Sequence, residues 1–82
     1  MQGSIINVKL GVLRQHIGKM ADYLKTAKRC PKGFICKIKG ELSRLRQIIR
    51  KQVKNYTSAE DSTPIKINKQ YFSEIRGIVA AI

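Results

Sequence analysis

The sequence is poor in the residue types that small proteins use for catalysis or metal binding. Of its 82 residues only five are Asp or Glu, one is His, two are Cys and none is Trp. Glu60 and Asp61 are the only adjacent carboxylates, and they fall in a polar linker where nothing buries them enough to shift a pKa usefully. We therefore expect no enzyme activity, no metal site and no other cofactor.

The sequence also lacks a run of the roughly 18 apolar residues that a membrane span needs, and it lacks a secretion signal. These absences predict an intracellular protein, cytoplasmic or nuclear. Cys30 and Cys36 flank an expected turn and could join two helix ends under oxidising conditions. Without a secretion signal, free thiols are the favoured interpretation. The phosphate-binding glycine motifs of nucleotide enzymes are missing, as are the fingerprints of zinc fingers and aromatic RNA-binding modules.

What the sequence has in excess is positive charge. Seventeen Lys and Arg stand against five acidic residues, which gives a formal net charge of +12 and a pI near 10.3. Such an excess increases repulsion within the compact state, so it indicates an anionic partner. The chain is still 43% hydrophobic, which is an ordinary value for a folded protein, and its length suits one domain with a modest core.

The apolar residues of the first third predict a long helix. They recur in steps of four and three from Ile6 to Ala27, which places this helix at about residues 4 to 28, with Ser4 as its N-cap. A second apolar strip on the same helix contains Ile5, Val12, His16 and Tyr23. So wide an apolar face predicts two neighbours. His16 is interpreted as a packing or interface residue, with a pH-sensitive contact as the alternative.

A turn and a second helix follow. Pro31 and Gly33 interrupt the first pattern, because proline lacks a hydrogen-bond donor and glycine favours turns. A new apolar stripe predicts a helix over about residues 34 to 56, antiparallel to the first because the connection is short. Residues 57–64 have the composition of a solvated linker, and residues 65–67 alternate too briefly to predict a strand.

The last part of the chain predicts a third helix, over about residues 69 to 81, with Asn68 as its N-cap. The fold class is therefore predicted to be all-α. It consists of an antiparallel helical hairpin with this C-terminal helix, as a three-helix bundle or as a dimeric helical bundle, and residues 1–82 form one basic domain. Gly11 and Gly18 share a helical face, where they either permit the close approach of another backbone or are merely tolerated.

The positive charge gathers at the tip of the predicted hairpin and along its second helix. The candidate nucleic-acid-binding residues are Lys25, Lys28, Arg29, Lys32, Lys37, Lys39, Arg44, Arg46, Arg50, Lys51 and Lys54. Those of the second helix form an outer stripe of Lys37, Arg44 and Lys51, and a stripe bordering the core of Lys39, Arg46, Arg50 and Lys54. Only Glu41 could balance them, so we expect this helix to meet phosphates. Phe34 either anchors the turn or stacks on a base.

These features predict a non-catalytic nucleic-acid-binding protein whose basic helical hairpin contacts the phosphate backbone of RNA or DNA. The alternative is a small interaction module, such as a regulator or inhibitor of viral or mobile-element origin, which docks on an acidic protein surface. It would use the same charges together with apolar residues such as Ile48. A membrane-active peptide is disfavoured, because the three apolar stripes can cover one another. A homodimer would double the basic surface.

Overall fold

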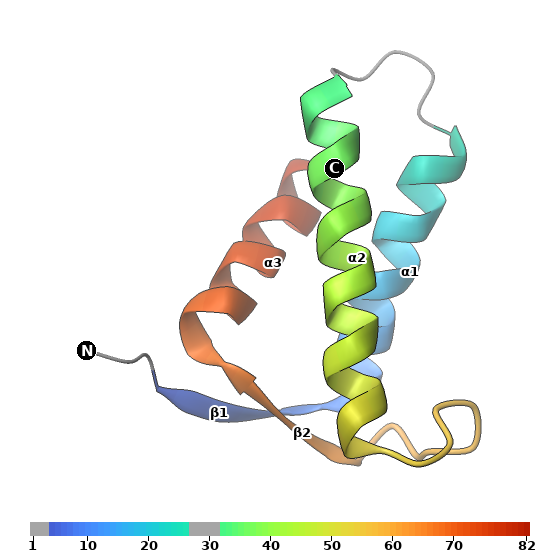
Figure 1. The fold of residues 1–82 in the computed structure, drawn as a ribbon, viewed down its shortest axis with the longest axis vertical. Coiled ribbons are helices and arrows are strands. Elements are labelled where there is room, and N and C mark those ends of the chain that lie inside the picture. Colours follow the sequence, from blue (N-terminus) through green and yellow to red (C-terminus); the bar gives the residue numbers. More distant parts are fainter. Residues whose placement is uncertain (1–3, 27–31) are drawn as a thin grey trace.

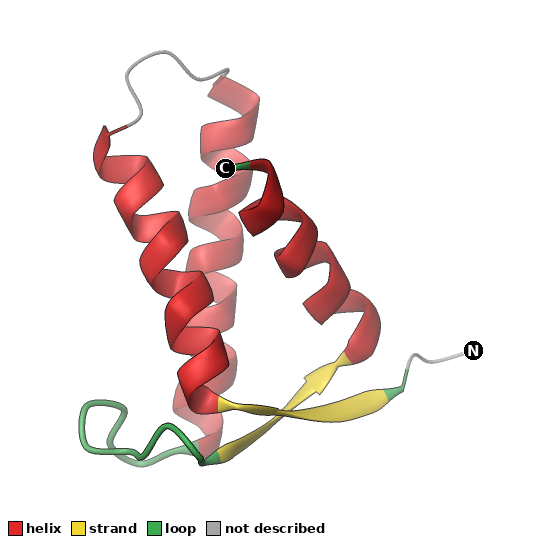
Figure 2. Cartoon of the chain, turned by 180° about the vertical axis from the view of Figure 1, so that it is seen from behind, coloured by secondary structure: helices red, strands yellow, loops and turns green. Residues whose placement is uncertain are grey.

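Three helices and a two-stranded antiparallel β-ribbon make up the fold (Figure 1). The computed structural model describes residues 4–26 and 32–82. Its elements are β1 (Ile5–Lys9), α1 (Leu10–Thr26), α2 (Lys32–Gln52), β2 (Pro64–Asn68) and α3 (Lys69–Ala81). Helices α1 and α2 run antiparallel, α3 packs against α1, and the ribbon closes one end of the three helices (Figure 2).

The strand β1 corrects the prediction of an all-α fold. The first helix begins at Leu10, and the prediction that it starts near Ser4 was wrong. Ile6 and Val8 are β-branched, which favours a strand, and both turn inward with the period of two that a strand imposes. Ser4 is not an N-cap, because strand β1 and not a helix follows it, and the Ser4 carbonyl accepts a hydrogen bond from the N–H of Lys69 at 2.8 Å. The protein is therefore mostly helical but not purely α.

The two short strands of the ribbon place their apolar residues side by side on the face that is turned toward the helices. Ile6 lies opposite Ile67, and Val8 lies opposite Ile65. Ile65 and Ile67 are 0% and 2% exposed, so the segment that alternates too briefly to predict as a strand is buried by its partner and by the helices. Each strand runs directly into a helix. The predicted cap of the third helix is confirmed, since the side chain of Asn68 accepts a hydrogen bond from the N–H of Tyr71 at 3.0 Å.

Helix α2 ends earlier than predicted, at Gln52. The side chain of this residue forms hydrogen bonds with the ribbon. The side-chain Nε2 of Gln52 donates to the carbonyl of Lys66 at 2.8 Å, and its Oε1 accepts from the N–H of Lys66 at 2.8 Å. These two bonds occupy the outer edge of β2, which would otherwise present unpaired backbone groups. Lys54, predicted to lie on the helix, is an exposed residue of the loop that follows.

The wide apolar face of α1 contacts two neighbours, as predicted. The ring of His16 lies 5.7 Å from that of Phe72 on α3, and the ring of Tyr23 lies 5.7 Å from that of Phe34 on α2. His16 also donates from Nδ1 to the carbonyl of Val12 at 2.7 Å. His16 and Phe34 therefore both take the packing role. Among residues 4–26 and 32–82, no helix combines the length and hydropathy that crossing a membrane requires.

Gly11 allows the loop before β2 to approach α1. Gly18, on the same helix, has no such neighbour and serves as the control position. A Cβ added at Gly11 would lie 2.8 Å from the Cβ of Asp61, whose carbonyl accepts the N–H of Gly11 at 2.9 Å. We expect Gly11→Ala to lower the free energy of unfolding by about 1–3 kcal/mol, because the loop must move. Gly18 has nothing within 4 Å of an added Cβ, so Gly18→Ala should raise that free energy by about 0.5–1 kcal/mol. Urea unfolding followed by circular dichroism measures both changes, and equal shifts would contradict the close approach.

Candidate nucleic-acid interface

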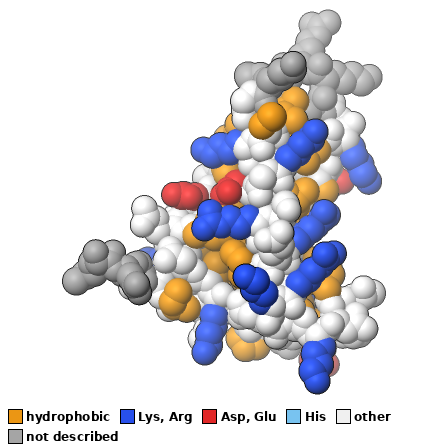
Figure 3. All heavy atoms as spheres, viewed as in Figure 1, with side chains coloured by type: hydrophobic (Ala, Val, Ile, Leu, Met, Phe, Trp, Pro, Cys, Tyr) orange, Lys and Arg blue, Asp and Glu red, His pale blue; other side chains and the backbone are white. Residues whose placement is uncertain are grey.

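Helix α2 carries its cations on the sides that point away from the core. Its buried stripe consists of Ile38, Leu42, Leu45 and Ile49. The Lys and Arg residues from position 37 to position 51 are all exposed: Lys37, Lys39, Arg44, Arg46, Arg50 and Lys51. Against them the helix holds a single carboxylate, that of Glu41. Figure 3 looks onto this helix and shows Lys and Arg side chains distributed along it. The described part of α2 is therefore a strongly cationic surface.

Lys39, Arg46 and Arg50 form the clearest constellation on this surface, which we call the groove cluster. They line one open groove between α2 and α1, together with Leu24, Leu42, Ser43 and Gln47. Its volume of about 270 Å³ lies below the roughly 300–1,000 Å³ of closed small-molecule sites. The groove thus suits a surface contact better than an enclosed ligand. The Ser43 hydroxyl and the Gln47 amide add neutral donors of the kind that contact phosphate oxygens.

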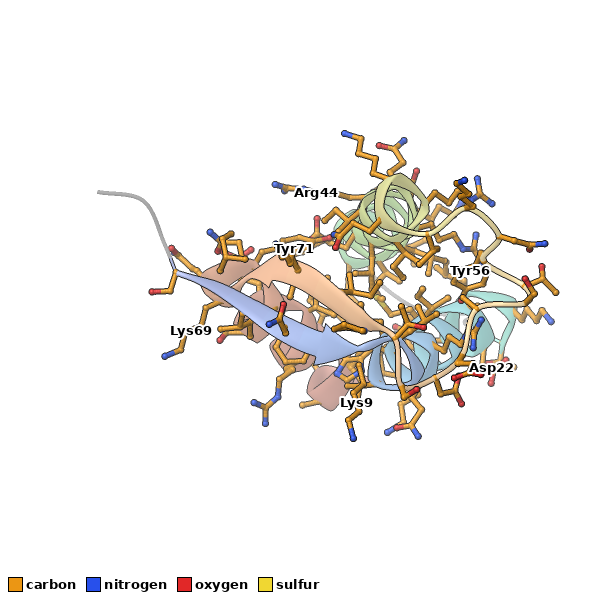
Figure 4. The ribbon with its side chains drawn as sticks, turned by 90° about the horizontal axis from the view of Figure 1, so that it is seen from below. Lys9, Asp22, Arg44, Tyr56, Lys69 and Tyr71 are labelled. Carbon is orange, nitrogen blue, oxygen red and sulfur yellow. The ribbon has the colours of Figure 1, made fainter. Side chains whose placement is uncertain are left out.

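Arg44 lies on the other side of α2 and is engaged in the fold. Its guanidinium carbon lies 4.5 Å from the ring centroid of Tyr71 on α3, and the two residues lie on neighbouring elements in Figure 4. The Tyr71 hydroxyl donates to the carbonyl of Glu41 at 3.4 Å, and Glu74 lines the same shallow pocket as Arg44. Arg44 therefore has an aromatic and an acidic neighbour, whereas the described contacts of Lys37, which belongs to the same predicted stripe, include neither. These neighbours make Arg44 a weaker candidate for a phosphate ligand.

The burial of Tyr71 gives a pH-dependent prediction. Burial, with a smaller contribution from the charge of Glu41, raises the pKa of Tyr71 to about 12 from its ordinary value of 10.0. The fold favours the neutral phenol, so this stabilisation is complete below pH 10 and is lost as the pH rises toward 12. In a titration followed by phenolate absorbance, we expect the tyrosine that ionises at the highest pH to disappear in Tyr71→Phe and to remain in Tyr56→Phe. If that ionisation persists in Tyr71→Phe, Tyr71 is not the group with the raised pKa.

The groove has the composition of a phosphate-binding surface. The groove cluster supplies two guanidinium groups and one ammonium group, Ser43 and Gln47 add two neutral polar groups, and no carboxylate lines the groove. Comparisons with protein-family models, with curated proteins and with solved structures found no match to this chain. Function must therefore be inferred from the charge and geometry of the molecule itself.

The predicted contact residues outside the main body of α2 are only partly described. Lys25 is exposed in the last turn of α1, and Lys54 is exposed after the end of α2. Lys28 and Arg29 lie outside the described residues, and of Lys32 only the backbone, at the start of α2, is described. The contribution of the hairpin tip to binding stays a prediction.

The remaining chemical groups have structural partners or stay untested. Within the described ranges, no three His, Cys, Asp or Glu side chains come together as a metal site. Cys36 is exposed, but Cys30 lies outside those ranges, so the state of the two thiols remains a prediction. Asp61 pairs with Arg14, which also donates to the carbonyl of Tyr56. These contacts hold the loop after α2 against α1.

Sequence reasoning missed one polar surface, which is the outer face of the ribbon. Asn7, Lys9 and Lys66 are exposed there, on strands whose alternate residues are turned toward the helices. The available signal was the period-two pattern of residues 6–8 and 65–67, in which a polar residue stands between two β-branched ones. Each pattern covers only three residues, so neither indicates a strand without its partner.

Proposed function

We propose that this protein binds nucleic acid without catalysing a reaction and that it holds the phosphate backbone along α2. The observation that carries this proposal is the groove cluster, in which Lys39, Arg46 and Arg50 line one open groove that contains no carboxylate. Arginine can hold two phosphate oxygens at once, whereas lysine supplies a mobile point charge. The net charge of +12 would also speed the approach to a polyanion.

The test is a binding titration of the full chain against duplex DNA, duplex RNA and single strands at several salt concentrations. If each residue of the groove cluster neutralises one phosphate, log K for duplex DNA should fall against log salt with a slope of about −2.7 or steeper. Single strands should give a shallower slope for the same number of contacts. A flat salt dependence, or no binding at low salt, would contradict the proposal.

Docking on an acidic protein surface is the competing function, and its apolar component is weak on α2. Ile48, which the sequence suggests as an exposed apolar contact, is half-buried and packs against the core. The exposed large apolar residues of the described chain are Ile5, Val12 and Ile82, and none lies on α2. Protein interfaces usually centre on desolvated apolar or aromatic anchors, so this face suits phosphates better. A protein partner that is retained after nuclease treatment would favour the competing function.

A further inference from the structure

The outer face of the β-ribbon is a second polar surface, at the end of the molecule where α1 and α3 begin. Its side chains alternate with the buried residues of both strands: Ile5, Asn7 and Lys9 on β1, and Pro64, Lys66 and Asn68 on β2. None of the six is acidic. Figure 4 views the molecule from below and shows the ribbon crossing in front of the helices, with no described element covering it.

The centre of this face brings an amide and an ammonium group together. Asn7 lies opposite Lys66 in the register of the ribbon. The side chain of Gln52 bonds both the N–H and the carbonyl of Lys66, so these two groups point away from β1. Asn7 and Lys66 therefore form a pair without backbone hydrogen bonds to each other. In such pairs the Cα atoms are only about 4.5 Å apart and the side chains are close. The carboxamide oxygen of Asn68, by contrast, is occupied by the cap of α3.

The ribbon face continues into the cationic surface of α2. The bonds between Gln52 and Lys66 fix the ribbon against the end of α2, where Arg50 and Lys51 are exposed. At the far end of β1, Lys9 borders the same shallow pocket as Asp61, whose carboxylate is already paired with Arg14. A polyanion lying on the ribbon would therefore meet further cations at the end of α2.

We propose that this ribbon enters the major groove of duplex DNA, where Asn7 and Lys66 contact base edges while the cations of α2 hold the adjoining phosphates. The inference rests on the proposed function and narrows it to one class of nucleic acid. The major groove of B-DNA is about 12 Å wide and admits a two-stranded ribbon, whereas the minor groove is about 6 Å wide. The major groove of an RNA duplex is deep and narrow, so side chains cannot reach its base edges.

The side chains of the face match the chemistry of that groove. In the major groove an asparagine amide can donate from its nitrogen to N7 of adenine while its oxygen accepts from the N6 amino group of the same base, and lysine can donate to O6 and N7 of guanine. Ile5 is 61% exposed at one end of β1, where it could contact a thymine methyl group.

The experiment selects binding sites from a random pool of DNA duplexes with the full chain and measures affinities for the selected site, an unrelated DNA duplex and an RNA duplex. We expect enrichment of a short sequence and at least about tenfold weaker binding to the RNA duplex at equal salt. Asn7→Ala and Lys66→Ala should each reduce the preference for the selected site by about fivefold or more. Lys19→Ala removes one positive charge, as Lys66→Ala does, but from an exposed position on α1, and it should leave that preference unchanged.

The outcomes separate this inference from the proposed function. Salt-dependent binding without a preferred sequence and with equal affinity for DNA and RNA duplexes would overturn the role of the ribbon and leave the role of α2 intact. The absence of salt-dependent binding to any nucleic acid would overturn both. Asn7 and Lys66 are exposed, so their variants should fold, and retained helical circular dichroism verifies this. Asn7→Asp, which preserves the shape and adds a negative charge, should lose the preference as well.

Discussion

Replacing Lys39, Arg46 and Arg50 together by glutamate is expected to abolish binding to nucleic acid while the helices remain folded. Each substitution removes one phosphate contact and adds a repulsive charge beside the others. The slope of log K against log salt should therefore become shallower by about three in any residual binding. All three side chains are exposed, so the substitutions leave the core untouched. Fluorescence anisotropy with a labelled duplex measures the loss, and circular dichroism measures the fold.

A pair of single variants distinguishes the geometry of α2 from the effect of net charge. Arg46→Glu and Arg76→Glu change the charge of the protein by the same amount, and both residues are exposed. Arg46 belongs to the groove cluster, whereas Arg76 lies on α3 with its guanidinium carbon 6.0 Å from the ring centroid of Phe72. Arg46→Glu should weaken binding much more. Equal losses would mean that overall charge, and not the groove, governs binding.

Ile65→Ala is expected to cost about 2–5 kcal/mol of stability, because it deletes a fully buried side chain and leaves a cavity. Proteins have total stabilities of about 0.05–0.15 kcal/mol per residue, so this loss is a large part of what so small a domain can have. Ile65 fills the space between the ribbon and the helices. Urea unfolding should show a much lower midpoint, or a chain that is largely unfolded without urea.

Ile5→Ala is the matched control on the same ribbon. Ile5 is 61% exposed on the outer face, so the same change in chemistry should cost no more than about 1 kcal/mol, mainly through strand propensity. The contrast between the two variants tests whether β2 is a packed strand. Similar small losses for Ile65→Ala and Ile5→Ala would contradict the burial of Ile65 beneath the ribbon.

Most of the helical structure follows from information that is local in the sequence. The apolar residues of α1 from Leu10 onward and those of α2 recur with the helical period, and this period alone indicates which faces are buried. The cap at Asn68 is equally local, since its side chain reaches a backbone N–H only three residues away. The cationic character of α2 likewise follows from composition, because Glu41 is the one acidic residue in a helix rich in Lys and Arg.

The ribbon depended on residues far apart in the chain. Ile6 fits the helical spacing of α1 as well as the alternation of a strand, and only the partner at Ile67 selects between them. The contact between the end of α2 and the ribbon is equally non-local, because the side chain of Gln52 bonds the backbone of Lys66, 14 residues further along the chain. Short strands carry too few residues to specify themselves, and their hydrogen bonds exist only once the partner is in place.

The sequence by itself determined three helices, their apolar faces, the antiparallel hairpin and the excess of positive charge along α2. Only the tertiary structure decided that residues 5–9 and 64–68 form a ribbon, that Arg44 packs on Tyr71, and that Lys39, Arg46 and Arg50 share a groove. The physical reason is the range of the interactions. Helical periodicity and capping act within a few residues, whereas strand pairing, the engagement of Arg44 and the formation of a groove require elements that only folding brings together.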